Sequence, residues 1–163
     1  MPATARLGAE GDGLAIALRT LELMRPTVGA AACGMAARAL DEARAMVRGR
    51  VRGGAARAAH DTVRMKLAEM ATELDAARLL VYRAAWLRES TAAGTRLDAE
   101  SSMAKLFASE AAGRIVDAAL QLHGGSGVVS GAVVERLYRE VRALRIYEGP
   151  SEVQKLIIAR TLL

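Results

Sequence analysis

The strongest pattern in this chain is an apolar stripe that repeats at alternating steps of four and three residues through the middle of the sequence. Side chains three and four positions apart lie on one face of an α-helix, so the stripe predicts a long helix from about Ala58 towards Arg88. The stripe consists of Val63, Leu67, Met70, Leu74, Ala77, Val81 and Ala84. A long helix with one apolar face needs other helices to cover that face.

The rest of the chain also predicts helices, separated by glycine-rich or polar breaks. The expected helices lie at residues 14–24, from Pro26 to about Arg48, from Asp98 to the Gly124-Gly125 pair, at 133–144, and from Glu152 to the end. Pro26 suits a first helical position, because the backbone N–H that it lacks would have no partner there. Ser151 and Gln154 have the spacing of a capping box. Residues 49–54 predict a connecting loop, and little in the sequence suggests a strand.

Composition favours the same architecture. Apolar residues make up 52% of the 163 residues and aromatic residues only 3%, so the core must consist of Leu, Val, Met and much Ala. These residues favour close-packed helices over sheets. Long helices joined by short connections predict an all-α, up-down four-helix-type bundle, with three long helices and some shorter ones, in one domain over residues 1–163.

The sequence also bears on the setting of the protein. The longest uncharged run, Pro26 to Ala37, is shorter than the roughly 18 residues that a membrane span needs, so no membrane span is expected. The N-terminus lacks the basic-then-apolar order of a leader peptide. Cys33 is the only cysteine and cannot form an internal disulfide, and its small side chain suits the close approach of another helix. We therefore expect a cytoplasmic protein.

A net charge of +5 comes mostly from arginines at residues 38–64. They could attract small polyanions such as CoA or a dinucleotide, or they could form a solvated helix face. No stacking aromatic residues alternate with them, so we expect no nucleic-acid partner. His60 and His123 have no spacing that suggests a metal site, and His123 is interpreted as a packed residue at a helix end.

Several motifs carry a resemblance to a known family. The closing stretch RIYEGPSEVQKLIIAR, the loop QLHGGSG at 121–127 and the two long segments MRPTVGAAACGMAARALDEA and MKLAEMATELDAARLLVYRAAW occur in the family's order. Residues 1–13 resemble the junction that precedes them. Over nearly its whole length the chain resembles the C-terminal helical domain of the acyl-CoA dehydrogenases. The resemblance implies that the family's N-terminal helical and middle β domains are absent from this chain.

The resemblance implies an active site around Glu148. This residue matches the family's base, which takes the α proton of an acyl-CoA or acyl-carrier-protein thioester, and desolvation would strengthen it as a base. Tyr147 and Gly149 flank it, and Arg25 matches an arginine near the active site that could position the loop or the thioester. Some branches place the base just before that arginine, but here the position is Met24. The alternatives are an ordinary exposed acid at Glu148 and a solvated arginine at Arg25.

The resemblance also implies FAD as a cofactor. Arg50 matches an arginine aimed at the pyrophosphate of a neighbouring subunit's FAD, and Gln121, Gly124 and Gly125 match residues that approach its ADP moiety. Three positions depart from the family pattern: Gly53 replaces a phenylalanine, Asp61 replaces a glutamine and would repel phosphate, and Pro150 replaces a threonine. We interpret the site as weakened and as lacking the half that other domains supply.

Three functions therefore stay open. The chain could be the C-terminal domain or subunit of an FAD-dependent acyl-CoA or acyl-carrier-protein dehydrogenase. It could be a non-catalytic bundle kept for subunit assembly, since this domain forms the tetramer core in the family. It could also use Glu148 without flavin, as a thioester isomerase, dehydratase or decarboxylase. All three predict a homo-oligomer or a hetero-oligomer, because a small bundle rich in Ala, Leu and Met leaves an apolar face uncovered.

Overall fold

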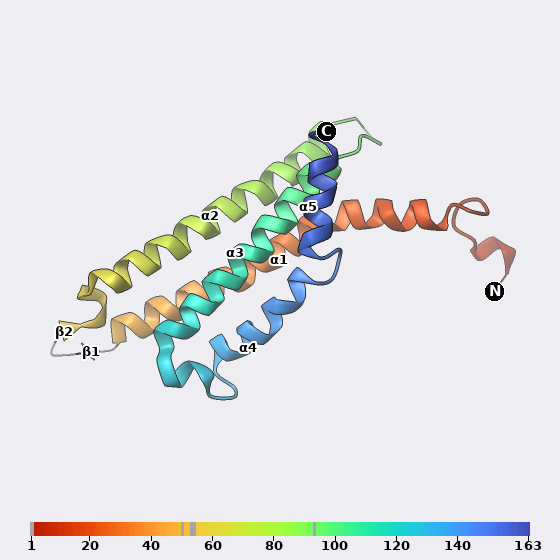
Figure 1. Ribbon diagram of the computed structural model, residues 1–163. Coiled ribbons are helices and arrows are strands. Elements are labelled where there is room, and N and C mark those ends of the chain that lie inside the picture. The colour runs from red at the N-terminus through yellow and green to blue at the C-terminus, as the bar shows by residue number, and fades with distance from the viewer. Residues whose placement is uncertain (1, 50, 53–54, 93) are drawn as a thin grey trace.

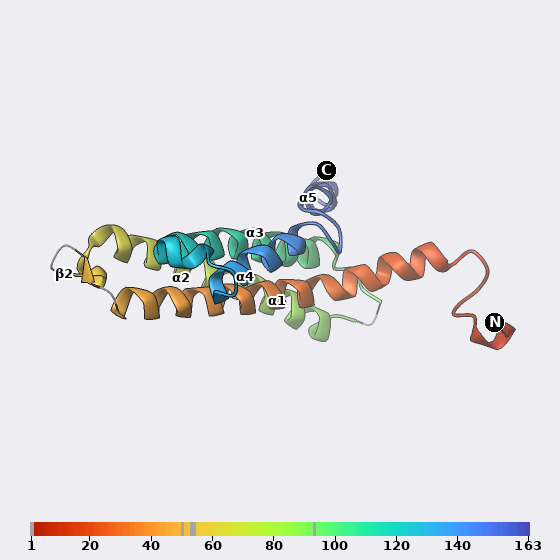
Figure 2. The same cartoon turned by 90° about the horizontal axis from the view of Figure 1, so that it is seen from below.

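The computed structural model describes all residues except 1, 50, 53–54 and 93. Three long helices, α1 (Gly13–Gly49), α2 (Asp61–Ser90) and α3 (Asp98–His123), run up, down and up beside one another (Figure 1). The shorter α4 (Val133–Val141) returns along the bundle, and α5 (Ser151–Arg160) stands off it (Figure 2). The predicted all-α bundle with three long helices and shorter ones is confirmed.

Short elements connect these helices. The 3-10 turns are Ala3–Ala5, Arg57–Ala59, Gly124–Val128 and Arg142–Arg145. Two strands of two residues each, β1 (Val51–Arg52) and β2 (Ala55–Ala56), pair antiparallel between α1 and α2, with Val51 opposite Ala56. The sequence predicted a loop in this segment and no strand. Only two backbone pairs distinguish this hairpin from a loop, and such a short pairing leaves no alternating apolar pattern in the sequence.

The core confirms that small side chains let the helices approach closely. Alanines fill it from each long helix: Ala32, Ala36, Ala39 and Ala43 from α1, Ala77 and Ala84 from α2, and Ala104, Ala108, Ala111, Ala112 and Ala119 from α3. At Gly29 three helices come close together, because a Cβ there would lie 3.0 Å from Val81 Cγ2 on α2 and 3.3 Å from the Ala104 carbonyl oxygen on α3. Cys33 is buried in the same core, and burial raises the pKa of its thiol.

The prediction that Pro26 begins a second helix was wrong. Pro26 lies inside α1, which continues from Gly13 to Gly49 without a break. Proline costs an interior helix one backbone hydrogen bond, but its fixed φ is helical. The turn before Pro26 is anchored by long-range contacts of Glu22 and Arg25, so the helix continues through it. The first turns of α1 extend past the other helices (Figure 2) and expose Leu14 and Leu18.

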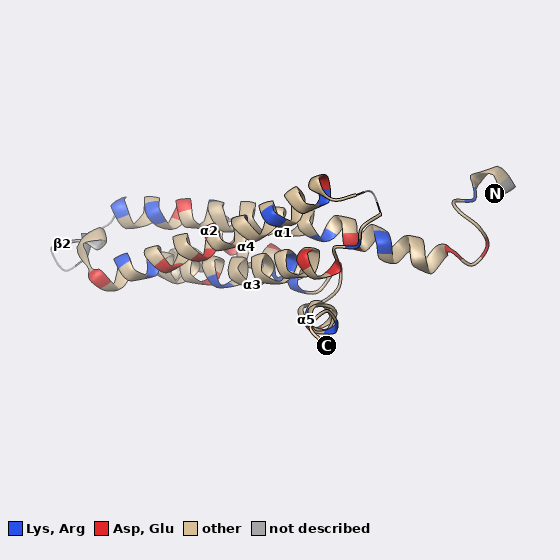
Figure 3. Cartoon of the chain, turned by 90° about the horizontal axis from the view of Figure 1, so that it is seen from above, with Lys and Arg blue, Asp and Glu red and all other residues tan. Residues whose placement is uncertain are grey.

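Charged residues of both signs are spread along the helices (Figure 3). Among the arginines of residues 38–64, Arg38 pairs with Glu42, Arg44 with Asp41 and Arg64 with Asp61. These pairs lie three or four residues apart on exposed helix surface, as expected for a solvated face. Within the described residues, no helix is both long and apolar enough to cross a membrane.

Candidate active site

The candidate site is built around a sharp turn between the last 3-10 turn and α5. Glu148 and Gly149 occupy its centre, and both have left-handed backbones, with φ of 56° and 87°. A left-handed conformation is ordinary for glycine but costs other residues about 1 kcal/mol or more, so it persists only where the surroundings hold it. The surrounding structure must therefore hold the backbone of Glu148 in this conformation.

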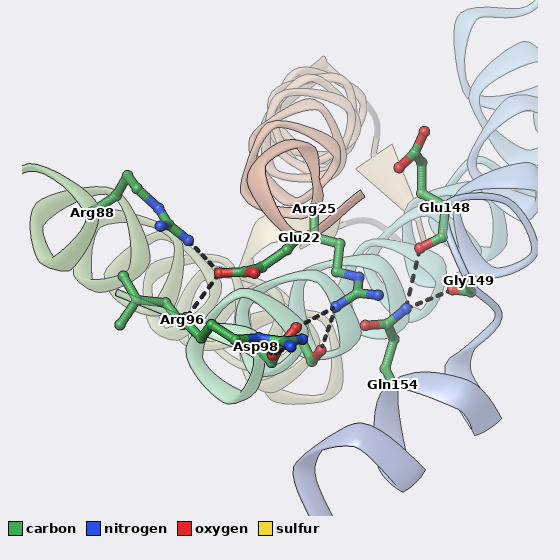
Figure 4. A network of polar contacts seen from close by, with 10 residues as sticks. Glu22, Arg25, Arg88, Arg96, Asp98, Glu148, Gly149 and Gln154 are labelled. Atoms are coloured by element: carbon green, nitrogen blue, oxygen red, sulfur yellow. Dashed lines mark hydrogen bonds and ion pairs between the residues drawn. The ribbon is translucent and has the colours of Figure 1, made fainter. Parts of the chain in front are cut away.

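Two fully buried side chains hold this turn. The Gln154 amide Nε2 donates hydrogen bonds to the carbonyl oxygens of Glu148 and Gly149, at 3.2 and 3.0 Å (Figure 4). Lys105 Nζ, from α3, donates to the same Gly149 carbonyl at 2.7 Å. A Cβ added to Gly149 would lie 2.5 Å from Gln154 Nε2, so the glycine is required for this arrangement. The turn is clamped from two helices at once.

A third contact ties the start of α5 to α3. The Ser151 hydroxyl donates to Glu110 Oε1 at 2.6 Å, and Glu110 Oε2 pairs with Arg145 Nη2 at 2.8 Å. The predicted capping box at Ser151 and Gln154 was wrong. Pro150 is the cap residue, its carbonyl accepts the Gln154 N–H, and both side chains of the expected box bind elsewhere. A carboxylate accepts a hydrogen bond more strongly than a neutral group, so Glu110 takes the Ser151 hydroxyl.

The Glu148 side chain is only partly exposed, and its Oε2 atom is enclosed without a hydrogen-bond partner among the described residues. Its carboxylate extends away from the Gln154 clamp, which holds only its backbone (Figure 4). Burial lowers the pKa of both Arg25 and Lys105, and the negative charge of Glu148 opposes that shift in each. An ordinary surface acid has both oxygens in water, so the reading of Glu148 as a fully solvated loop acid does not describe this structure.

Arg25 is buried in the middle of α1, which contradicts the reading of a solvated arginine at a helix start. Its Nη1 donates to Ser102 Oγ at 3.3 Å and lies 3.9 Å from Asp98 Oδ1. In the part of the chain that the structure describes, its Nε has no hydrogen-bond partner. Burial lowers the pKa of Arg25, and the charges of Asp98, Glu22 and Glu148 oppose that shift. The guanidinium thus lies inside the protein, within the electrostatic field of Glu148.

Glu22 connects the same end of α1 to the α2–α3 connection. Its Oε1 accepts from Arg88 Nη2 at 2.6 Å and from the Leu97 N–H at 2.8 Å (Figure 4). Burial by itself raises the pKa of Glu22, but the hydrogen bonds from Leu97 and Arg88 outweigh it, so the pKa is lowered. The carboxylate is stabilised in its ionised form and fixes the start of α3 against α1.

The glycine loop predicted to approach a cofactor lies at the other end of the bundle. Gln121, Gly124 and Gly125 are all exposed there. Lys105 and Gln121 are 16 residues apart on α3, which at 1.5 Å per residue separates them by about 24 Å. The structure therefore gathers Arg25, Glu148 and Gly149 at one end and the glycine loop at the other.

Residues 11–163 match the family described as the C-terminal domain of acyl-CoA dehydrogenase. The chain belongs to the acyl-CoA dehydrogenase family. A 3-(aryl)acrylate reductase of Clostridium sporogenes is 45% identical over 96% of this chain and 41% of its own length. An acyl-CoA dehydrogenase of Bacillus subtilis is 43% identical over 100% of this chain and 42% of its own. Butyryl-CoA dehydrogenase of Megasphaera elsdenii superimposes with a TM-score of 0.94 at 36% identity, over 99% of this chain and 42% of its own.

The chain thus spans about two fifths of the length of these relatives. Two of its three predicted departures from the family pattern, Asp61 and Pro150, lie in the part of the chain that the structure describes. Asp61 begins α2, is exposed and pairs with Arg64 at 3.4 Å. Arg50 and Gly53 lie outside the described residues. Pro150 is accommodated as the cap of α5, where its missing N–H costs no helical bond.

Sequence reasoning missed the residues that hold the turn, above all Lys105, Gln154 as a clamp, and Glu110. One signal for Lys105 was available. Within the predicted third helix it shares a face with Ser101, Ala108 and Ala112, at steps of three and four. All four are buried, so Lys105 is a charge on the core face of the helix. A charge in that position needs a buried partner.

The interpretation of His123 as a packed residue at a helix end is confirmed. It is buried at the last position of α3, and its Nδ1 lies 2.8 Å from the Ala119 carbonyl oxygen. In the part of the chain that the structure describes, no group of three His, Cys, Asp or Glu side chains is placed to hold a metal ion.

Proposed function

We propose that this chain is the base-bearing C-terminal domain, or subunit, of an FAD-dependent acyl-CoA or acyl-carrier-protein dehydrogenase. The observation that carries the proposal is the Glu148 carboxylate, half enclosed, on a turn that buried Gln154 and Lys105 fix. A carboxylate that is held in place and partly shielded from water is a better general base, because both conditions lower the activation free energy of the proton transfer. Tyr147, half exposed beside it, and Gly149 would line the thioester cleft, with Arg25 behind them.

In the proposed reaction Glu148 takes the proton from the carbon α to the thioester. The C–H bond electrons form the double bond to the β carbon, from which a hydride departs. Bound FAD would supply the hydride acceptor. In the opposite direction protonated Glu148 returns the proton to the α carbon, by microscopic reversibility. One site therefore serves a dehydrogenase and a reductase, the two names that relatives of this chain bear.

The exposed end of α3 fits a contact with FAD. A Cβ at Gly124 or Gly125 would meet nothing within 4 Å, so a flat group can approach the backbone there, beside the exposed Gln121 amide. The proposal includes Arg50 as a pyrophosphate ligand, and the exposed Asp61 would weaken that contact by charge repulsion. Because Gln121 lies about 24 Å along α3 from Lys105, which holds the Glu148 turn, we infer that the glycine loop serves the FAD of a neighbouring subunit.

The experiment that tests the function uses the assembled enzyme, by which we mean this chain together with the family's N-terminal helical and β domains, on one polypeptide or as a partner subunit. We expect the assembled enzyme to bind FAD and turn yellow, and the flavin absorbance to bleach when an acyl-CoA is added without an electron acceptor. An assembly that stays colourless after addition of FAD would contradict the proposal.

We also propose that the domain self-associates through the outer face of α2, and that the protein is cytoplasmic. Leu79, Tyr82 and Trp86 lie three and four residues apart on α2, and more than 60% of each side chain is exposed. An exposed apolar stripe of this kind usually marks an interface. We expect an oligomer in sedimentation at micromolar concentration, and a monomer for the double variant Tyr82→Glu and Trp86→Glu. Tyr138→Glu on α4 is the control, and a monomeric wild type would contradict this proposal.

A further inference from the structure

Lys105 is a charged residue in a place where charges are rare. Its side chain is fully buried in α3, among Ser101, Ser102 and Ala108. Removing an ammonium group from water is costly, so a buried lysine needs partners for both its hydrogen-bond donors and its charge. The hydrogen-bond partner is the Gly149 carbonyl, at 2.7 Å from Nζ. That carbonyl belongs to the residue after Glu148.

The charges that act on Lys105 come from four parts of the chain. Arg25 faces it from α1, Glu110 from its own helix, Glu148 from the turn and Glu152 from α5. Burial lowers the pKa of Lys105 below its ordinary value of 10.5, and Arg25 lowers it further, whereas the three glutamates oppose that shift. Glu110 is already bound by Arg145 and Ser151, so its charge is shared. No hydrogen bond or ion pair joins the Glu148 carboxylate to another described residue.

We propose that Lys105 is a positioning residue for Glu148: its buried ammonium group donates to the Gly149 carbonyl and so fixes the left-handed turn that carries the carboxylate. This inference rests on the proposed function, in which Glu148 is the base. The hydrogen bond determines where the base lies, and a base that is out of place transfers a proton more slowly.

Gln154 provides an internal comparison for this clamp. Its Nε2 donates to the same Gly149 carbonyl and is as deeply buried as Lys105, but it is neutral. A variant of Gln154 therefore loses a clamp on the turn and no charge. Lys105→Gln retains a donor one bond closer to the backbone and loses the charge, whereas Lys105→Met loses both. The three variants together show whether the hydrogen bonds to Gly149 hold the turn.

The first measurement needs neither flavin nor substrate. The chain has three lysines, Lys66, Lys105 and Lys155, so the titration of each side chain can be followed by NMR. In Glu148→Gln we expect the titration midpoint of Lys105 to fall, because a negative charge that favours the ammonium form is gone. Lys66 and Lys155 serve as internal references. An unchanged Lys105 midpoint in a folded Glu148→Gln variant would show that the two charges do not lie close together, which would overturn the placement on which the proposal rests.

The second measurement tests the clamp in the assembled enzyme. Lys105→Met should lower kcat about 10- to 100-fold and leave KM nearly unchanged, because a displaced base slows the proton transfer more than it weakens substrate binding. Gln154→Met should show the same division between kcat and KM, and Lys105→Gln should recover part of the rate. A kcat in Lys105→Met equal to that of wild type, or a loss that appears in KM and not in kcat, would overturn the proposal.

The two measurements also separate this inference from the proposed function. If the assembled enzyme shows no acyl-CoA chemistry, the function fails, while the NMR titration still reports whether Lys105 and Glu148 are coupled. Helical content, measured by circular dichroism, identifies any variant that does not fold. Glu148→Gln changes a residue on a partly exposed turn, so it tests the coupling even if both Lys105 variants fail to fold.

Discussion

Replacing Glu148 by Gln should lower kcat of the assembled enzyme by about 10⁴-fold, the upper end of what a general base contributes. The amide has the size of the carboxylate and cannot accept the α proton. Gln at residue 148 has the same conformational cost as Glu in the left-handed backbone, and the carbonyl of this residue would stay bound to Gln154. Flavin absorbance and helical content should be unchanged. The check is acyl-CoA-dependent flavin reduction under single-turnover conditions.

Glu152 offers a matched control for this prediction. It lies four residues later, in the first turn of α5, and its side chain is exposed. Glu152→Gln removes the same charge from the same region and should leave the rate of flavin reduction within a few-fold of wild type. Comparable rates for Glu148→Gln and wild type would show that Glu148 is not the base. A loss in both variants would point to regional charge rather than to a proton transfer.

Gly149→Ala should destabilise the chain by about 2–4 kcal/mol. The left-handed backbone at φ 87° costs a residue with a Cβ about 1–2 kcal/mol. The new Cβ would also lie 2.5 Å from Gln154 Nε2, and Gln154 is fully buried and has little room to retreat. Moving its amide weakens the hydrogen bonds to the Glu148 and Gly149 carbonyls, which costs about another 1–2 kcal/mol.

The measurement is the free energy of unfolding from urea titration of the chain, followed by circular dichroism. Gly125→Ala is the control. It lies in a 3-10 turn with a backbone outside the left-handed region, and a Cβ there would meet no atom within 4 Å. Its free energy of unfolding should stay within about 0.5 kcal/mol of wild type. Equal stabilities of the two variants would mean that the turn relaxes without cost and that Gln154 is no clamp.

The two variants with the largest expected effects change adjacent residues, Glu148 and Gly149. The sequence predicted the role of these residues only in part. The motif around Glu148 identified the turn and its acid. The forces on that turn come from Lys105, 44 residues away along the chain, and from Glu110 through Ser151, 41 residues away. A local sequence pattern cannot predict such long-range pairs. The position of Lys105 on the core face of a predicted helix did indicate that it needs a buried partner.

The two wrong predictions, the capping box and the helix start at Pro26, have the same cause: contacts with other elements that the local sequence does not record. The capping box at Ser151 and Gln154 satisfied the local rule, but a carboxylate from α3 and two carbonyls of the turn were better partners. Pro26 satisfied the local rule for a helix start, yet α1 runs through it. There, Leu97 and Ser102 anchor the flanking side chains of Glu22 and Arg25 from the start of α3. In each case a contact distant in sequence outweighed a preference worth about 1–3 kcal/mol.

The sequence by itself determined the helical class, the positions of α2 and α3, the small-residue core and the family, because periodicity and motif order are local properties of the chain. Only the tertiary structure decided which groups meet: that α1 is one helix, that Arg25 and Lys105 are buried beside Glu148, and that the glycine loop lies at the far end of the bundle. Those outcomes depend on which helix faces touch. Packing sets that choice, and burial then makes a single charge or hydrogen bond strong enough to fix a turn.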